Sequence, residues 1–211
     1  MIIINPETHS TQYFFLALIM PGIMLQGMLR DGVTNWMPSF LLETFGLSEE
    51  NSIVSTVILA IFTMISYSAF GALQKRFFKN EVTCAAAIFG ASALICAVLF
   101  AINLLAPNTA LVPSLVLMAL TVAAMHGVNL MLIAIVPRRF AVFGKVSTYS
   151  GILNASTYVG AALSTYGFAA LAERFDWNFT ILTWVAISFV GAAVCFFGAR
   201  IWQRHLDEYE F

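Results

Sequence analysis

The stretch GMLRDGVTNW, residues 27–36, places an arginine and an aspartate side by side within apolar sequence. The seventeen residues before Arg30, from Tyr13 to Leu29, contain no charge. An arginine presents a planar fork of donors that suits the paired oxygens of a phosphate or a carboxylate. Gln26 and Thr34 lie one helical turn before and after Arg30, so the three would form one polar stripe on a helix. This spacing predicts a binding site for an anion.

Other interpretations of this charged pair stay open. Both residues could lie near a helix end, with the guanidinium reaching the lipid headgroups, or Arg30 could pair with an acid. Within the expected spanning segments the only acid is Asp31. Neighbours on a helix point about 100° apart, so we expect the two to pair poorly. Asp31 could carry a proton, balance Arg30 or contact another helix, and we favour a structural or gating role.

Further polar side chains interrupt two later apolar segments. His126 and Asn129 share one segment, and Asn154 and Tyr158 share the next. A lone histidine in a membrane is more often a satisfied hydrogen-bonding group than a ligand-binding one, but His126 could also face a pore. Helical spacing gives the later segment two stripes. One would line a cavity (Ser147, Ser150, Asn154, Tyr158, Ala161 and Thr165), and one of small residues would contact another helix (Ser156, Gly160 and Ser164).

The composition assigns these residues to membrane helices. Of the 211 residues, 60% are hydrophobic and 10% are charged, whereas soluble domains carry about 25% charged residues. A spanning helix needs about 20 apolar residues. The expected fold is an all-α transmembrane six-helix bundle with short tails at 1–11 and 203–211 and no soluble domain. The six segments are 12–42, 52–73, 82–105, 111–136, 145–171 and 177–202.

The basic residues predict how these segments are oriented. Six crossings place most of them on one side of the membrane, which the positive-inside rule makes cytoplasmic. We therefore expect both termini in the cytoplasm of a bacterial inner membrane. The N-terminal twelve residues lack a basic residue and a cleavage site, so we expect no signal peptide. The basic residues on the shared side are Lys75, Arg76, Lys79, Arg138, Arg139, Lys145, Arg200 and Arg204.

Polarity varies along the six segments in a repeating order. Two polar segments precede a bland one, and the same order follows in the second half of the chain. Many secondary transporters are built from two three-helix repeats with the binding site at the repeat interface. The pattern predicts such a pair of repeats, with the polar helices lining a cavity and the bland ones facing lipid.

Several kinds of chemistry have no support in the sequence. It contains no GxxxxGK[ST] phosphate loop, no HExxH and no GxSxG motif. The three cysteines form no CxxC motif, and no acids or histidines have metal-ligand spacing. We therefore expect no enzyme, no coupling by ATP within this chain, no cofactor and no nucleic-acid partner.

Longer stretches resemble the C-terminal six helices of a major facilitator superfamily transporter. The likeness is strongest to the organophosphate:phosphate antiporters, which exchange glycerol phosphate or hexose phosphate. LRDGVTNWMPSFLLETFGLS is similar to their seventh helix, with an arginine followed by glycine, tryptophan and proline. VPRRFAVFGKVSTYSGILNASTYVGAALSTYGFAALAERFDW is similar to the region of their tenth and eleventh helices. GALQKRFFKN resembles the superfamily's cytoplasmic loop motif at Gly71, Leu73 and Arg76.

The resemblance implies specific roles. In that family one arginine from each half holds the substrate phosphate, and Arg30 matches the C-terminal one. Tyr158 matches a tyrosine near the same cavity, and Gly71 and Arg76 match gating positions. Gly27 stands where glycerol-phosphate members have a tyrosine. The likeness covers half of such a transporter, so we expect an N-terminal six-helix half as a partner.

These features lead to one hypothesis and its rivals. The chain would be part of a secondary transporter for an anionic, phosphorylated organic solute, exchanged for phosphate by alternating access. One alternative is a proton-coupled carrier of sugar acids or other carboxylates. Another is a transporter-like membrane sensor of sugar phosphates, and a further one is a homodimer of six-helix units.

Overall fold

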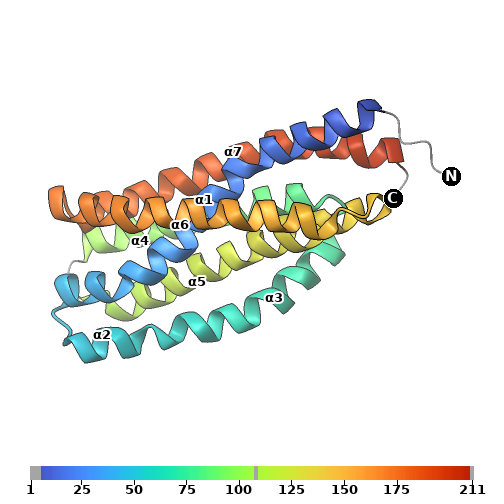
Figure 1. Cartoon of the computed structure of the whole chain (residues 1–211). Helices are drawn as coiled ribbons and strands as arrows, with labels where there is room; N and C mark the ends of the chain where they lie inside the picture. Colours follow the sequence, from blue (N-terminus) through green and yellow to red (C-terminus); the bar gives the residue numbers. More distant parts are fainter. Residues whose placement is uncertain (1–5, 107–108, 210–211) are drawn as a thin grey trace.

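The computed structural model describes residues 6–106 and 109–209, and Figure 1 shows them as a bundle of long helices. Of the described residues, 93% are helical and none forms a strand. The elements are α1 (Pro6–Phe45), α2 (Glu49–Ser55), α3 (Val57–Phe77), α4 (Glu81–Leu105), α5 (Leu111–Asn129), the π-helix η1 (Leu130–Ile135), the 3₁₀-helix η2 (Val136–Phe143), α6 (Val146–Arg174) and α7 (Trp177–Tyr209).

Length and composition confirm a helical protein suited to a membrane. Five stretches within the described chain are long and apolar enough to cross a bilayer: Phe14–Phe45, Glu49–Phe77, Glu81–Leu105, Leu111–Ala141 and Trp177–Arg204. Helix α6 has 29 residues, which at about 1.5 Å per residue also suffices to span. Its many hydroxyl side chains make α6 more polar than these five stretches.

Helix α1 is continuous through Pro21, Pro38 and the charged pair. The expected segment 12–42 therefore lies within one helix. Part of the expected N-terminal tail, from Pro6, is also helical, whereas residues 1–5 lie outside the described chain. The expected C-terminal tail is helical to Tyr209 as the end of α7. The second expected segment, 52–73, is divided between α2 and α3 by a turn at Thr56.

The chain reverses direction after α1 because of local turn chemistry. Gly46 has a φ of 66°, a left-handed conformation that glycine adopts without a steric penalty. Its backbone N–H donates to the Leu42 carbonyl at 3.0 Å. Ser48 then caps α2, since its hydroxyl accepts from the Asn51 backbone N–H at 3.3 Å. This turn brings α2 and α3 back along the bundle.

Helices α1 and α5 form the centre of the bundle. Helix α1 packs against α5, α6 and α7, while α4 packs against α5 and α7. Helix α3 packs against α5 and lies at one edge, as Figure 1 shows. Residues from α1, α3, α5 and α6 can therefore meet around the α1–α5 contact.

Two glycines set the close approach of α1 and α6. A Cβ atom on Gly160 would lie 1.9 Å from the Met24 carbonyl oxygen, and one on Gly27 would lie 2.2 Å from the Thr157 carbonyl oxygen. The two helices therefore pack backbone to backbone. The face of α6 that was expected to contact another helix is the inward one, with Ser156, Gly160 and Ser164 all buried. Gly160 thus acts in helix packing.

Proline changes the helix geometry after α5. Pro137 has no N–H, so it cannot pair with the Ile133 carbonyl as an α-helix would require. The chain passes from a π-helix to a 3₁₀-helix here. The Ser150 hydroxyl of α6 donates to that Ile133 carbonyl at 2.8 Å. A side chain from a neighbouring helix thus satisfies the carbonyl, as a membrane interior requires.

A buried acid holds one end of the bundle together. Glu81, at the start of α4, is fully buried. Its Oε1 accepts from Arg139 Nε at 3.0 Å and Nη2 at 2.6 Å, and its Oε2 accepts from Trp202 Nε1 at 3.1 Å. The carboxylate therefore joins α4, η2 and α7. The ends of α3 and α7 that carry the basic residues of the sequence pattern lie at this same end (Figure 1).

We expect Gly160→Ala to destabilise the bundle, because a methyl group would push the α1 and α6 backbones apart. Overpacking of this kind costs about 1–3 kcal/mol, or a loss of roughly 2–10 °C in Tm for a chain of this size. Thermal unfolding of the purified protein in detergent measures the change. Gly151→Ala is the matched control, since a Cβ there meets nothing within 4 Å. An equal Tm for the two variants would contradict this packing.

Candidate functional site

Arg30 and Asp31 form a two-point ion pair in the middle of α1. The Arg30 Nε lies 2.6 Å from Asp31 Oδ1, and Nη2 lies 2.9 Å from Oδ2. The expectation that these neighbours would pair poorly is therefore wrong. The two Cβ directions do diverge, but the long arginine stem folds back along the helix and spans the gap. Asp31 balances the charge of Arg30 within its own helix.

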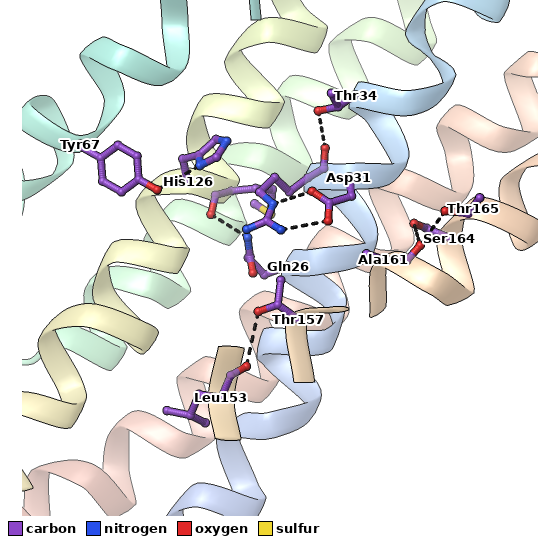
Figure 2. Close-up of polar contacts among 12 residues, drawn as sticks. Gln26, Asp31, Thr34, Tyr67, His126, Leu153, Thr157, Ala161, Ser164 and Thr165 are labelled. Carbon is purple, nitrogen blue, oxygen red and sulfur yellow. Dashed lines mark hydrogen bonds and ion pairs between the residues drawn. The ribbon is translucent and has the colours of Figure 1, made fainter. Parts of the chain in front are cut away.

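Three aromatic side chains from other helices lie near enough to this pair to interact with it electrostatically. Tyr67 of α3 and His126 of α5 are hydrogen-bonded, with 3.3 Å between the hydroxyl and Nδ1. Both Tyr67 and Tyr158 of α6 lie within electrostatic range of the Arg30 guanidinium, as does His126. Figure 2 shows Tyr67 and His126 on one side of the α1 residues and Ser164 and Thr165 of α6 on the other. We call Arg30, Asp31, Tyr67, His126 and Tyr158 the Arg30 cluster.

Gln26 supports this cluster from a buried position. Its side chain is fully buried, and its Nε2 donates to the Met125 carbonyl of α5 at 3.2 Å (Figure 2). Its Oε1 has no hydrogen-bond partner among the described residues. A buried polar atom without a partner is costly. Gln26 links Arg30's helix to the helix of His126.

Thr34, Asn129 and Asn154 have different surroundings. The Thr34 hydroxyl donates to the Arg30 backbone carbonyl at 2.6 Å, a local bond along α1 (Figure 2). Asn129 is half-buried at the end of α5, where the π-helix begins. Asn154 is exposed on α6, one turn before Tyr158. The interactions of the Arg30 guanidinium and the Asp31 carboxylate in the described chain include none of these three side chains.

Of the positions with expected gating roles, Asp31 belongs to the Arg30 cluster, whereas Gly71 and Arg76 follow Tyr67 along α3. Gly71 is half-buried on α3, where an added Cβ atom would lie 3.7 Å from a Leu130 methyl group. Arg76 is exposed at the end of α3, with its guanidinium 5.3 Å from the centre of the Phe77 ring. Gly27 faces the Thr157 backbone, so a tyrosine side chain would not fit there.

The exposed face of α6 beside the cluster is mostly apolar. Tyr158 is 60% exposed, and a shallow hollow beside it has a volume of about 550 Å³. This hollow is lined by Ala155, Tyr158, Val159, Ala162, Leu163 and Tyr166. The hollow therefore shares Tyr158 with the Arg30 cluster and is otherwise lined by α6 residues that are mostly apolar.

Sequence reasoning missed Tyr67 as a partner of His126 and Glu81 as a buried anchor. The sequence does not show that Tyr67 contacts His126, because this contact depends on the packing of α3 on α5. Glu81 resembled an ordinary acid in the first turn of a helix. No group of three or more histidine, cysteine or acidic side chains among the described residues could hold a metal ion. The three cysteines are buried and unpaired.

No protein-family model matches this chain, and a search of curated proteins found no match. What the site could bind therefore follows from the geometry of its own residues. A half-buried guanidinium and two phenol hydroxyls can donate hydrogen bonds to the oxygens of an anion, whereas the Asp31 carboxylate can only accept them.

We expect the two ion pairs to differ in their effect on stability. Glu81→Gln removes a fully buried charge that holds three donors, so it should cost about 2–4 kcal/mol. Asp31→Asn keeps an acceptor beside a partly exposed arginine and should cost about 1 kcal/mol or less. Thermal unfolding of both variants in detergent provides the measurement. A larger loss of stability for Asp31→Asn than for Glu81→Gln would contradict this expectation, because it would show that the Arg30–Asp31 pair stabilises the bundle more.

Proposed function

We propose that this chain is one half of a secondary transporter that moves an anionic, phosphorylated organic solute across a membrane. Exchange for phosphate would proceed by alternating access, with a second six-helix unit completing the carrier. Arg30 holds the anion, the Tyr67 and Tyr158 hydroxyls contact it, and Gln26 and His126 shape the site. The observation that supports this most is the position of Arg30 at the middle of the Phe14–Phe45 span.

A guanidinium near the centre of a membrane span is costly, so its presence indicates a functional role. A charge at the bilayer centre costs about 2.5–3.5 kcal/mol on insertion scales. Snorkelling to the headgroups is disfavoured, because the guanidinium is held beside Asp31 and its side chain is only 14% exposed. Ion pathways and substrate sites are where membrane proteins retain such residues.

The exposed polar side chains support a second membrane unit. Only 11% of the most apolar part of the α2–α3 stretch is buried in the bundle. Tyr67, Ser68 and Asn154 are exposed. Lipid tails offer these groups no hydrogen bonds. A second half would cover this face and enclose an aqueous path beside the Arg30 cluster. This role fits the resemblance to half of a twelve-helix transporter.

The basic end of the bundle favours a particular orientation. Lys75 and Arg76 lie in the last turn of α3, and Arg200 and Arg204 lie in the C-terminal part of α7, before its last turn. At the other end, α1 ends and α2 begins with Glu43, Glu49 and Glu50. By the positive-inside rule, this distribution supports the proposal that both termini lie in the cytoplasm.

A second candidate is a proton-coupled carrier of sugar acids, and Asp31 is the observation that favours it. Protonation of this carboxylate would release the Arg30 fork, so one proton could accompany one anion. Uptake that persists after the proton gradient is collapsed, but needs internal phosphate, would exclude this candidate.

We expect Arg30→Lys to weaken anion binding by the complete carrier at least about tenfold. A lysine keeps the charge but loses the two-point fork, which corresponds to a loss of about 1.4 kcal/mol. Exchange of radiolabelled inorganic phosphate in phosphate-loaded proteoliposomes measures the half-saturating concentration.

Arg174→Lys is the matched control, because Arg174 is exposed at the end of α6. It should leave the half-saturating concentration unchanged. Equal concentrations for wild type and Arg30→Lys would contradict the role of Arg30 as an anion clamp.

A further inference from the structure

We propose that the Asp31 carboxylate is an internal substitute for the transported anion, which must displace it from the Arg30 fork. This inference rests on the proposed function and adds a second specificity-determining residue to its site. Asp31 then sets how strongly an anion must bind before it can occupy Arg30.

The geometry of the pair resembles a bound ligand. Two carboxylate oxygens accept from two guanidinium nitrogens at 2.6 and 2.9 Å. This two-point arrangement is the one that arginine makes with a solute carboxylate or phosphate. No other described residue is hydrogen-bonded to the Arg30 guanidinium. Asp31 therefore occupies the Nε and Nη2 edge of the guanidinium, where an anion could otherwise bind.

The Asp31 carboxylate is held only by Arg30 within the described chain. No other described donor bonds to it, and its side chain is 26% exposed, against 14% for Arg30. It could therefore rotate away from Arg30 without breaking a bond to any other described helix. Asp31 is thus the more exposed partner of the pair.

The Glu81–Arg139 ion pair shows how a structural carboxylate differs. Glu81 is 0% exposed, and it accepts from Trp202 as well as from Arg139. It links three elements that are distant in sequence. Asp31 has neither the burial nor the second donor, and it joins no two helices of the described chain. Its arrangement is that of an exchangeable ligand.

The charge balance favours such an exchange. Arg30 and Asp31 together are neutral, and the groups that face them from α3, α5 and α6 are Tyr67, His126 and Tyr158. Tyrosines are neutral near pH 7. An anion added to the intact pair would gain little Coulomb attraction, whereas an anion that replaces Asp31 gains the whole guanidinium. Solutes with two neighbouring oxygens, such as phosphates and carboxylates, are those that can replace it.

Arginine-specific labelling of the full chain in lipid nanodiscs tests this inference. Phenylglyoxal condenses with guanidinium nitrogens, and mass spectrometry measures the rate at Arg30 and Arg139 in one sample. We expect Asp31→Asn to speed labelling of Arg30 at least about fivefold, which corresponds to about 1 kcal/mol, and to leave Arg139 unchanged. Glu81→Gln is the positive control, because it removes the carboxylate that pairs with Arg139. An unchanged or slower rate at Arg30 in Asp31→Asn would overturn the inference.

Inorganic phosphate, added as a probe, separates this inference from the proposed function. We expect phosphate to protect Arg30 in Asp31→Asn at a concentration at least about fivefold below that needed in wild type, again about 1 kcal/mol. A need for more phosphate in the variant would show that Asp31 merely positions Arg30, and would overturn the inference while Arg30 remains an anion site. An absence of phosphate protection in both forms would count against the proposed function, and the labelling rates would still decide whether Asp31 occupies the fork.

Discussion

The guanidinium of Arg30 is the constraint to which the centre of the bundle is adapted. A cation within an apolar helix needs a counter-charge and polar neighbours, since lipid supplies neither. Asp31 supplies the counter-charge from the same helix. Tyr67, His126 and Tyr158 supply polar groups from α3, α5 and α6. Four helices thus contribute to the surroundings of one side chain.

Rigid and exchangeable features lie close together in this structure. The α1–α6 contact at Gly27 and Gly160 fixes the backbone that carries Arg30, and Glu81 fixes the end of the bundle. The side chains of the Arg30 cluster are less constrained, because Tyr67 and Tyr158 are exposed and Asp31 has one partner in the described chain. A carrier needs both properties, since a site must keep its shape while its ligand is exchanged.

The sequence predicts much of the fold, because apolar length and small-residue spacing are local properties. Ser156, Gly160 and Ser164 form the buried face of α6 as their spacing indicates. The contacts within the site could not be predicted in this way. Helical angles alone argued against the Arg30–Asp31 pair, because they ignore the reach of a long side chain. The Tyr67–His126 bond and the burial of Glu81 depend on which helices pack together, and spacing along one helix does not show that.

The most direct test of the account is whether the face beside Arg30 meets water in the membrane. The complete carrier would carry one introduced cysteine, Asn154→Cys on the α6 face or Phe196→Cys on the exposed face of α7, in intact membranes. The native cysteines are buried and should stay silent. The account predicts that a charged thiol reagent modifies Asn154→Cys and that phosphate slows this reaction, while Phe196→Cys stays unmodified in lipid. If the reagent modified neither introduced cysteine, the result would contradict the account.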